Sequence, residues 1–83
     1  MTTTPAQART MVGTAILRIV PDADVDGVSP DADLRQTFDL DSLDFLSFVE
    51  LLTQQSGVRI EEDDYPELAT MASTQAFLAR RSG

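Results

Sequence analysis

The stretch DSLDFLSFVELLTQQSG, residues 41–57, contains the strongest helix pattern in the chain. Asp41 suits the N-cap position, and Asp44 stands at the third helical position, where the acid of a capping box belongs. Gly57 marks the end of this helix, because glycine commonly follows a helix C-terminus. The apolar residues between these ends recur at intervals of three and four and therefore share one face: Phe45, Phe48, Val49 and Leu52.

A second helix is predicted at the start of the chain. Thr4 offers a hydroxyl at the N-cap, Pro5 suits the first helical position, and Pro21 ends the helix near Val20. One apolar stripe at helical spacing runs along this segment: Ala8, Met11, Val12, Ala15, Ile16, Ile19 and Val20. The stripe is typical of a helix that packs against a core.

The C-terminal third predicts a short helix and a long one. Gly57 is followed by an extended link at 58–60, and the acidic segment 61–68 is expected to form one or two helical turns around Tyr65. Thr70 can cap a last helix. Its inward residues are Met71, Thr74, Phe77 and Leu78.

These elements predict an all-α protein, a small four-helix bundle made of three main helices and one short helix. The acidic segment 21–41 is expected to be a long loop between the first two helices, because it is rich in Asp, Pro and Gly. No internal repeat or strand pattern interrupts this reading. We expect a single domain over residues 1–83, with about 6–81 structured, in a monomeric protein.

The composition argues against an enzyme. The chain has no Cys, His, Lys or Trp, which removes the common catalytic dyads, a Schiff-base lysine and an ordinary zinc site. The net charge is −8, and all fourteen acidic residues lie between 21 and 67. Such a surface repels nucleic acid and anionic lipid but attracts basic proteins or divalent cations. With no apolar run long enough to span a membrane and no secretion signal, we expect a cytoplasmic protein without membrane insertion.

The acidic loop offers one candidate site for a metal ion. Residues 22–33 match the calcium-loop pattern D-x-D-x-D-G-x-x-x-x-x-D, with weak candidate ligands at Asp22, Asp24, Asp26 and Asp33. The twelfth position is Asp instead of the longer Glu, the eighth is Ser29 instead of an aliphatic residue, and no second loop exists. A solvated acidic loop is therefore favoured, and a calcium-binding helical module is kept as the alternative function.

The second candidate site is the start of the middle helix, and here the chain resembles the acyl carrier proteins. The resemblance runs from about residue 6 to 81 and rests on motifs with matching spacing: SPDADL at 29–34, DSLD at 41–44, GVRI at 57–60, the acidic turn with Tyr65, and Thr70. The chain departs from the family at Phe38-Asp39, where Leu-Gly is common. It also lacks the Gly-Gly-x-Ser-Leu form of peptidyl carriers, and 53–55 are neutral where housekeeping fatty-acid carriers often have Glu.

The resemblance implies that Ser42 carries a covalent 4′-phosphopantetheine group, derived from coenzyme A, whose thiol holds acyl groups as thioesters. The lack of Cys fits this, since a thiol can then come only from a prosthetic group. Ser42 has no base of its own, so a separate phosphopantetheinyl transferase must attach the group. Asp41 is expected to assist by helping to hold the transferase's magnesium ion.

The resemblance also implies partners and an acyl site. A discrete acyl carrier would present acyl groups to loading and processing enzymes of fatty-acid, polyketide or related biosynthesis, which have basic docking surfaces. The expected recognition face is Asp41, Leu43, Asp44, Leu46, Ser47 and Glu50. The expected lining for a sequestered acyl chain is Leu34, Phe45, Leu52, Ile60 and Leu68.

Overall fold

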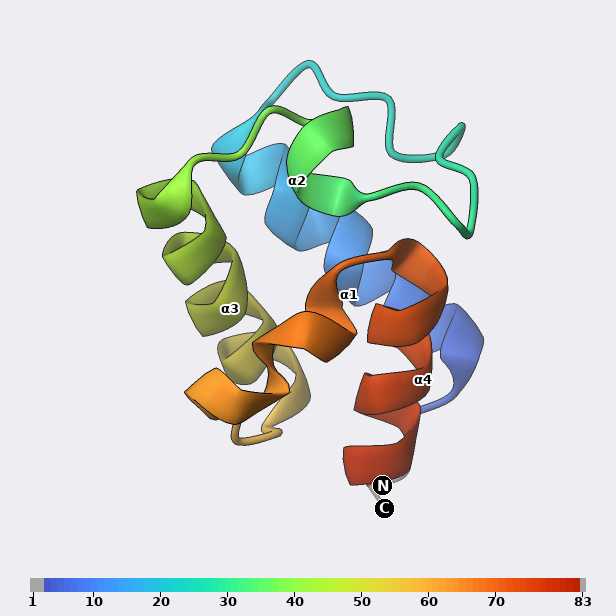
Figure 1. Cartoon of the computed structure of the whole chain (residues 1–83). Coiled ribbons are helices and arrows are strands. Elements are labelled where there is room, and N and C mark those ends of the chain that lie inside the picture. The colour runs from blue at the N-terminus through green and yellow to red at the C-terminus, as the bar shows by residue number, and fades with distance from the viewer. Residues whose placement is uncertain (1–2, 83) are drawn as a thin grey trace.

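The computed structural model describes residues 3–82, so residues 1, 2 and 83 of the predicted domain lie outside it. The described chain is all-helical, and its long helices are α1 (Pro5–Ile19), α3 (Ser42–Ser56) and α4 (Met71–Arg81). Two short helices complete it, α2 (Leu34–Thr37) and the 3₁₀ helix η1 (Glu62–Leu68). Figure 1 shows α2 and the long loop over one end of the bundle. The predicted all-α bundle is confirmed.

The three long helices begin where the sequence places their caps. Thr4 accepts a hydrogen bond from the Gln7 amide at the start of α1, and Thr70 accepts one from the Ser73 amide at the start of α4. Gly57 ends α3 in the left-handed conformation, with φ of 73°. These ends are local hydrogen-bond and backbone preferences, which is why the sequence alone locates them.

The helix α2 was not predicted, because residues 21–41 were expected to be loop throughout. Asp33 caps it, with Oδ1 accepting from the Gln36 amide at 3.0 Å, and Leu34 is fully buried beneath it. The Leu34 amide also donates to the Ala69 carbonyl at 2.8 Å. A single turn with one buried anchor has no period to recognise in the sequence, so its formation depends on this docking against the start of α4.

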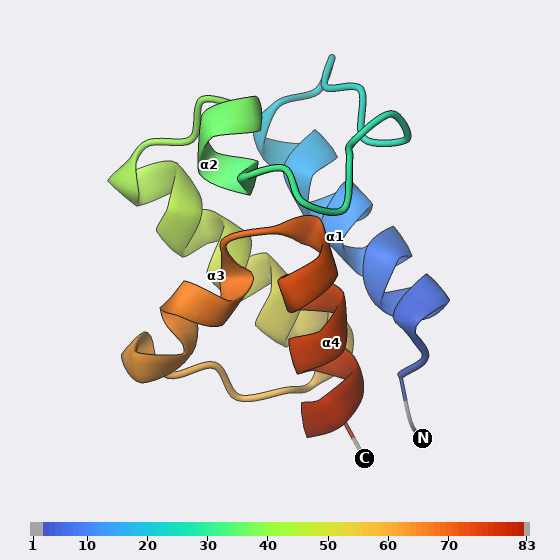
Figure 2. The same ribbon diagram turned by 45° about the vertical axis from the view of Figure 1, so that its right-hand side comes forward.

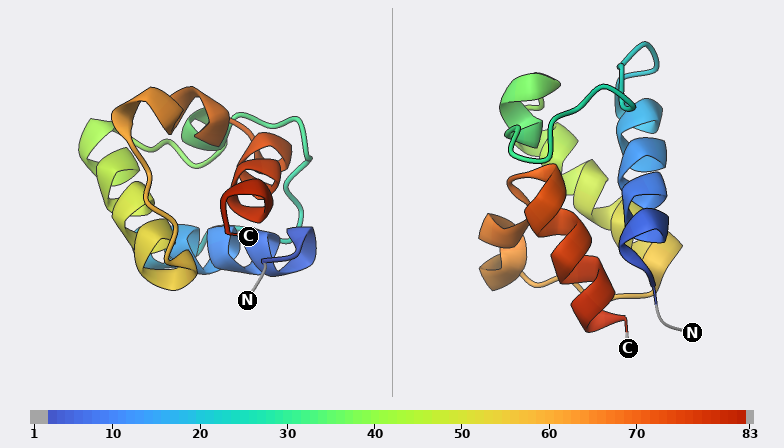
Figure 3. Two further views of the ribbon diagram at one scale, coloured as in Figure 1. Left: turned by 90° about the horizontal axis from the view of Figure 1, so that it is seen from below. Right: turned by 90° about the vertical axis from the view of Figure 1, so that its right-hand side faces the viewer.

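The core lies where α1 packs against α3 and α4, and η1 packs against α4. Figures 2 and 3 show α1 and α4 side by side, and the ends of the described chain meet, with the Thr3 amide donating to Ser82 Oγ at 2.7 Å. Side chains that are completely buried come from every helix: Ala8, Val12, Ala15, Ile16, Leu34, Phe48, Leu52, Leu68, Phe77 and Leu78. The predicted apolar faces of the long helices therefore supply most of the core.

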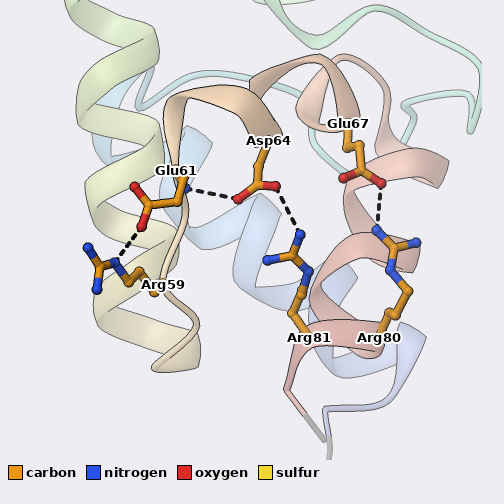
Figure 4. A network of polar contacts seen from close by, with 6 residues as sticks. All are labelled: Arg59, Glu61, Asp64, Glu67, Arg80 and Arg81. Atoms are coloured by element: carbon orange, nitrogen blue, oxygen red, sulfur yellow. Dashed lines mark hydrogen bonds and ion pairs between the residues drawn. The ribbon is translucent and has the colours of Figure 1, made fainter.

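Ion pairs hold η1 in place against the last helix. Asp64, which is buried, accepts from Arg81 Nη2 at 3.0 Å through one carboxylate oxygen and from the Glu61 amide at 3.0 Å through the other. Figure 4 shows Asp64 between these two partners, with the more exposed pair of Glu67 and Arg80 beside them. The short helix is therefore fixed to α4 on one side, while its other side faces α3.

Candidate functional site

The start of α3 is built by a reciprocal pair of carboxylates. Asp41 Oδ1 accepts from the Asp44 amide at 2.8 Å, and Asp44 Oδ2 accepts from the Asp41 amide at 3.4 Å. Ser42, the first residue of the helix, lies between them and is exposed. Within residues 3–82 no hydrogen bond engages the Ser42 hydroxyl. Its oxygen is therefore open to an incoming group and is not needed for the cap.

The arrangement suits a phosphate ester on Ser42. The N–H groups of Ser42 and Leu43 belong to the first turn of α3 and have no intrahelical acceptor, so they lie at the positive end of the helix dipole. A phosphodiester is favoured at such an end. The carboxylates of Asp41 and Asp44 are engaged in the cap, and within residues 3–82 no base is hydrogen-bonded to the hydroxyl. A nucleophilic role would need a base from another protein.

The approach to the site contains a backbone conformation that the sequence did not reveal. Asp39 has φ of 54°, in the left-handed region that glycine prefers. The next residue, Leu40, is buried, and its amide donates to the Arg35 carbonyl at 2.9 Å. The chain must therefore reverse sharply at Asp39 to bury Leu40 and still turn Asp41 and Ser42 outward.

The residues of the predicted recognition face lie on the outer side of α3. Leu43 is 74% exposed and Leu46 is 44% exposed, which makes them two of the most exposed large apolar side chains described. Ser47 and Glu50 are exposed as well, whereas Asp44 is half-buried. The first turns of α3 thus carry an apolar pair and two carboxylates, a mixture that suits contact with a protein surface.

The residues of the predicted acyl-chain lining do not all lie in one place in the structure. Leu34, Phe45, Leu52 and Leu68 are buried in the core, whereas Ile60 is half-buried at the surface. Ile60 contributes to an open groove of about 420 Å³ between α3 and the η1 segment. The other lining residues are Leu46, Val49, Glu50, Thr53, Gln54 and Tyr65.

Tyr65 forms the far wall of this groove and was not predicted to be a site residue. Its ring meets the Phe45 ring edge-on, with centroids 5.3 Å apart and planes at 80°. Because η1 packs on α4 and holds Tyr65 from that side, the contact is decided by tertiary structure. The only sequence signal for Tyr65 was its place at the centre of the acidic turn.

The acidic loop does not bring its aspartates together. Asp24 Oδ1 accepts from the Gly27 amide at 3.2 Å, and Asp33 is turned away to cap α2. Asp22 and Asp26 are exposed. Over residues 3–82 no three acidic side chains converge on a point that could hold a metal ion. The sequence pattern of a calcium loop is thus present without the corresponding arrangement of ligands.

Comparison with known proteins shows the family to which the chain belongs. A family model described as "Phosphopantetheine attachment site" matches residues 14–78, which include α3 and both short helices. This family attaches 4′-phosphopantetheine covalently. A comparison with curated proteins gave no match. None of the helices described in residues 3–82 is long and apolar enough to cross a membrane.

Proposed function

The chain belongs to the phosphopantetheine attachment family, and on that premise we propose that it is an acyl carrier protein whose prosthetic group is attached to Ser42. The observation that carries the proposal is the exposed Ser42 hydroxyl at the first position of α3, left without a hydrogen bond by a cap that Asp41 and Asp44 complete between themselves. When bound, the group supplies a terminal thiol that holds acyl groups as thioesters.

The residues around Ser42 have separate roles in this proposal. The first-turn amides of α3 stabilise the negative charge of the phosphodiester. Asp41 holds the helix start in place and helps a transferase to position its magnesium ion. The Ser42 oxygen forms a bond to the phosphorus that carries pantetheine in coenzyme A, the pyrophosphate bond breaks, and adenosine 3′,5′-bisphosphate leaves. The serine proton passes to a base on the transferase, because no hydrogen-bonded base lies beside Ser42 within residues 3–82. The protein is thus a substrate and carrier, and not an enzyme.

The proposed partners are a phosphopantetheinyl transferase and the enzymes that load and process the acyl group in fatty-acid, polyketide or related biosynthesis. The exposed side chains of Leu43 and Leu46 supply apolar contact, and Asp44 and Glu50 supply negative charge for a basic docking surface. The groove that ends at Tyr65 supports a proposal that short acyl groups rest between α3 and η1. A cytoplasmic location and a monomeric state stay predictions.

Intact-mass measurement tests the assignment of Ser42. Incubation with coenzyme A, magnesium and a broad-specificity transferase is expected to add one phosphopantetheine to the protein and none to Ser42→Ala. Ser29→Ala is the matched control, since Ser29 is an exposed serine outside the recognition face, and it should be modified fully. Ser42→Ala should keep its helical circular dichroism, because the cap belongs to Asp41. Modification of Ser42→Ala, or none of the unmutated protein beside a reactive control carrier, would overturn the proposal.

A further inference from the structure

A second open groove, of about 450 Å³, lies between the last turn of α1 and the outer side of α3. Its residues are Arg18, Ile19, Asp44, Ser47, Glu50, Leu51 and Gln54. Three of them, Asp44, Ser47 and Glu50, also belong to the proposed recognition face. The groove therefore extends that face across the helix boundary and adds one positive charge to it.

Antiparallel packing of the two helices places Arg18 beside the first half of α3. Gln55, near the end of α3, donates through Nε2 to the Met11 carbonyl at 3.2 Å. Arg18 lies two turns further along α1, which corresponds to the turns of α3 that contain Asp44 and Ser47. Arg18 thus lies near the end of the bundle that presents Ser42 and lines one groove with Asp44.

Arg18 differs from the other arginines in having no partner. Within residues 3–82 it makes no hydrogen bond, ion pair or aromatic contact, and it is exposed. Each of the other five has such a contact: Arg9 with two loop carbonyls, Arg35 with the Phe45 ring, and Arg59, Arg80 and Arg81 with carboxylates. Arg18 lines a groove together with Asp44, Ser47 and Glu50 of the recognition face, and its guanidinium is therefore available to another molecule.

We propose that Arg18 is a specificity-determining residue of the docking surface: it favours a partner protein that places a carboxylate against Arg18 and basic side chains against Asp44 and Glu50. The inference rests on the proposed carrier function. A partner surface that is basic throughout would set a cation against Arg18, and such a like-charge contact lowers the association rate. Arg18 thus disfavours enzymes that serve uniformly acidic carriers.

A purely structural role for Arg18 makes a different prediction. A cation in the last turn of a helix interacts favourably with the helix dipole, and Arg18 occupies that position in α1. If this were its only role, replacing Arg18 would lower the melting temperature slightly and leave the rate with every partner unchanged. A change in reaction rate that depends on the partner enzyme would indicate the docking role, whereas a change in melting temperature alone would indicate the structural role.

The test compares Arg18→Glu with Arg59→Glu, which makes the same change in net charge beyond the opposite end of α3. The probes are a broad-specificity phosphopantetheinyl transferase and a malonyl transferase of general fatty-acid synthesis, assayed at low salt and at about 0.5 M salt. Arg18→Glu is expected to raise kcat/KM at low salt on the order of threefold, and salt should remove the gain because it screens exposed charges. Arg59→Glu should raise kcat/KM at low salt clearly less than Arg18→Glu does. Equal gains for both variants, or none for Arg18→Glu, would overturn the inference.

A charge exchange tests the preferred partner directly. Single Lys→Glu and Arg→Glu variants are made across the docking surface of the phosphopantetheinyl transferase. Each variant is assayed with the unmutated carrier and with Arg18→Glu. The natural transferase should have a higher kcat/KM with Arg18→Glu than with the unmutated carrier. At least one transferase variant should reverse this order and have the higher kcat/KM with the unmutated carrier. Failure of every variant to reverse it would overturn the inference. Failure of the unmutated carrier to be modified would instead overturn the proposed function, so the two failures are distinguishable.

Discussion

Asp41 and Asp44 bond to each other's backbone amides across the first turn of α3, at 2.8 and 3.4 Å, and the side chain of Ser42, the first helical residue, takes no part. The first helical residue is thus held in position by its neighbours while its own side chain stays free. A cap made by Ser42 itself would be destroyed by modification of its hydroxyl. The division of roles lets a covalent group be attached without loss of the helix start.

Two substitutions of Asp41 are expected to separate its structural role from its role in attachment. Asp41→Ala removes the cap and should cost about 1 kcal/mol in the free energy of unfolding. Asp41→Asn keeps an acceptor for the Asp44 amide, and asparagine is as good an N-cap as aspartate, so stability should stay close to that of the unmutated protein. Urea denaturation measures both. Attachment of phosphopantetheine to Asp41→Asn should nevertheless be slower. A rate equal to that of the unmutated protein would show that Asp41 only caps the helix and does not assist attachment.

The left-handed backbone at Asp39 predicts that glycine stabilises this position. Asp39→Gly should raise the free energy of unfolding by about 0.5–1 kcal/mol, since glycine adopts a positive φ without steric cost. Asp39→Val should lower it by about 1–2 kcal/mol, because a β-branched side chain clashes there. Asp31→Gly is the control in the same loop, and without a positive φ it should give no gain. Stabilisation by both glycines would show that charge, and not backbone strain, is responsible.

The buried contact between Asp64 and Arg81 is expected to matter more than its exposed neighbour. Asp64→Ala removes an acceptor from both Arg81 and the Glu61 amide and should cost about 1–3 kcal/mol. Arg80→Gln breaks the exposed pair with Glu67 and should cost at most about 0.5 kcal/mol. Thermal unfolding at equal protein concentration compares them. Equal losses would indicate that the burial of Asp64 does not strengthen its bonds.

The acidic loop is expected to be structural and not a calcium sensor. Asp24→Asn combined with Asp26→Asn should leave attachment to Ser42 unchanged, because an asparagine at 24 can still accept from the Gly27 amide. Removal of two like charges should leave stability unchanged or raise it slightly. Isothermal titration with calcium is the measurement. A micromolar affinity that the double substitution abolishes would favour the calcium-binding alternative.

The low charge on the outer side of α3 predicts a carrier that is specialised for its own enzymes. Ser47 and Gln54 are exposed and uncharged, so the helix offers little charge to a housekeeping malonyl transferase beyond Asp44 and Glu50. Ser47→Glu combined with Gln54→Glu should raise the loading rate by that transferase and steepen its salt dependence. Loading is timed beside a general fatty-acid carrier. Equal rates before substitution, with no gain afterwards, would contradict specialisation without affecting the proposed carrier function.

The sequence determined the elements whose causes are local. Thr4, Asp41 and Thr70 cap their helices through hydrogen bonds that span three residues, and apolar spacing identified the buried face of each long helix. Ser42 was singled out by the resemblance to the acyl carrier proteins, and the cap at Asp41 fixes its place at the start of α3. The family match covers residues 14–78, which include the caps at Asp41 and Thr70 but not Thr4.

Tertiary structure decided what depends on residues that are distant in the sequence. The turn α2 exists because Leu34 is buried and bonded to Ala69, and this also commits Asp33 to a cap instead of a metal site. Arg18 and Asp44 line one groove only because α1 and α3 pack together. Caps and apolar periods act within one or two helical turns and are visible in the sequence, whereas docking of segments that lie tens of residues apart depends on how the whole core fills.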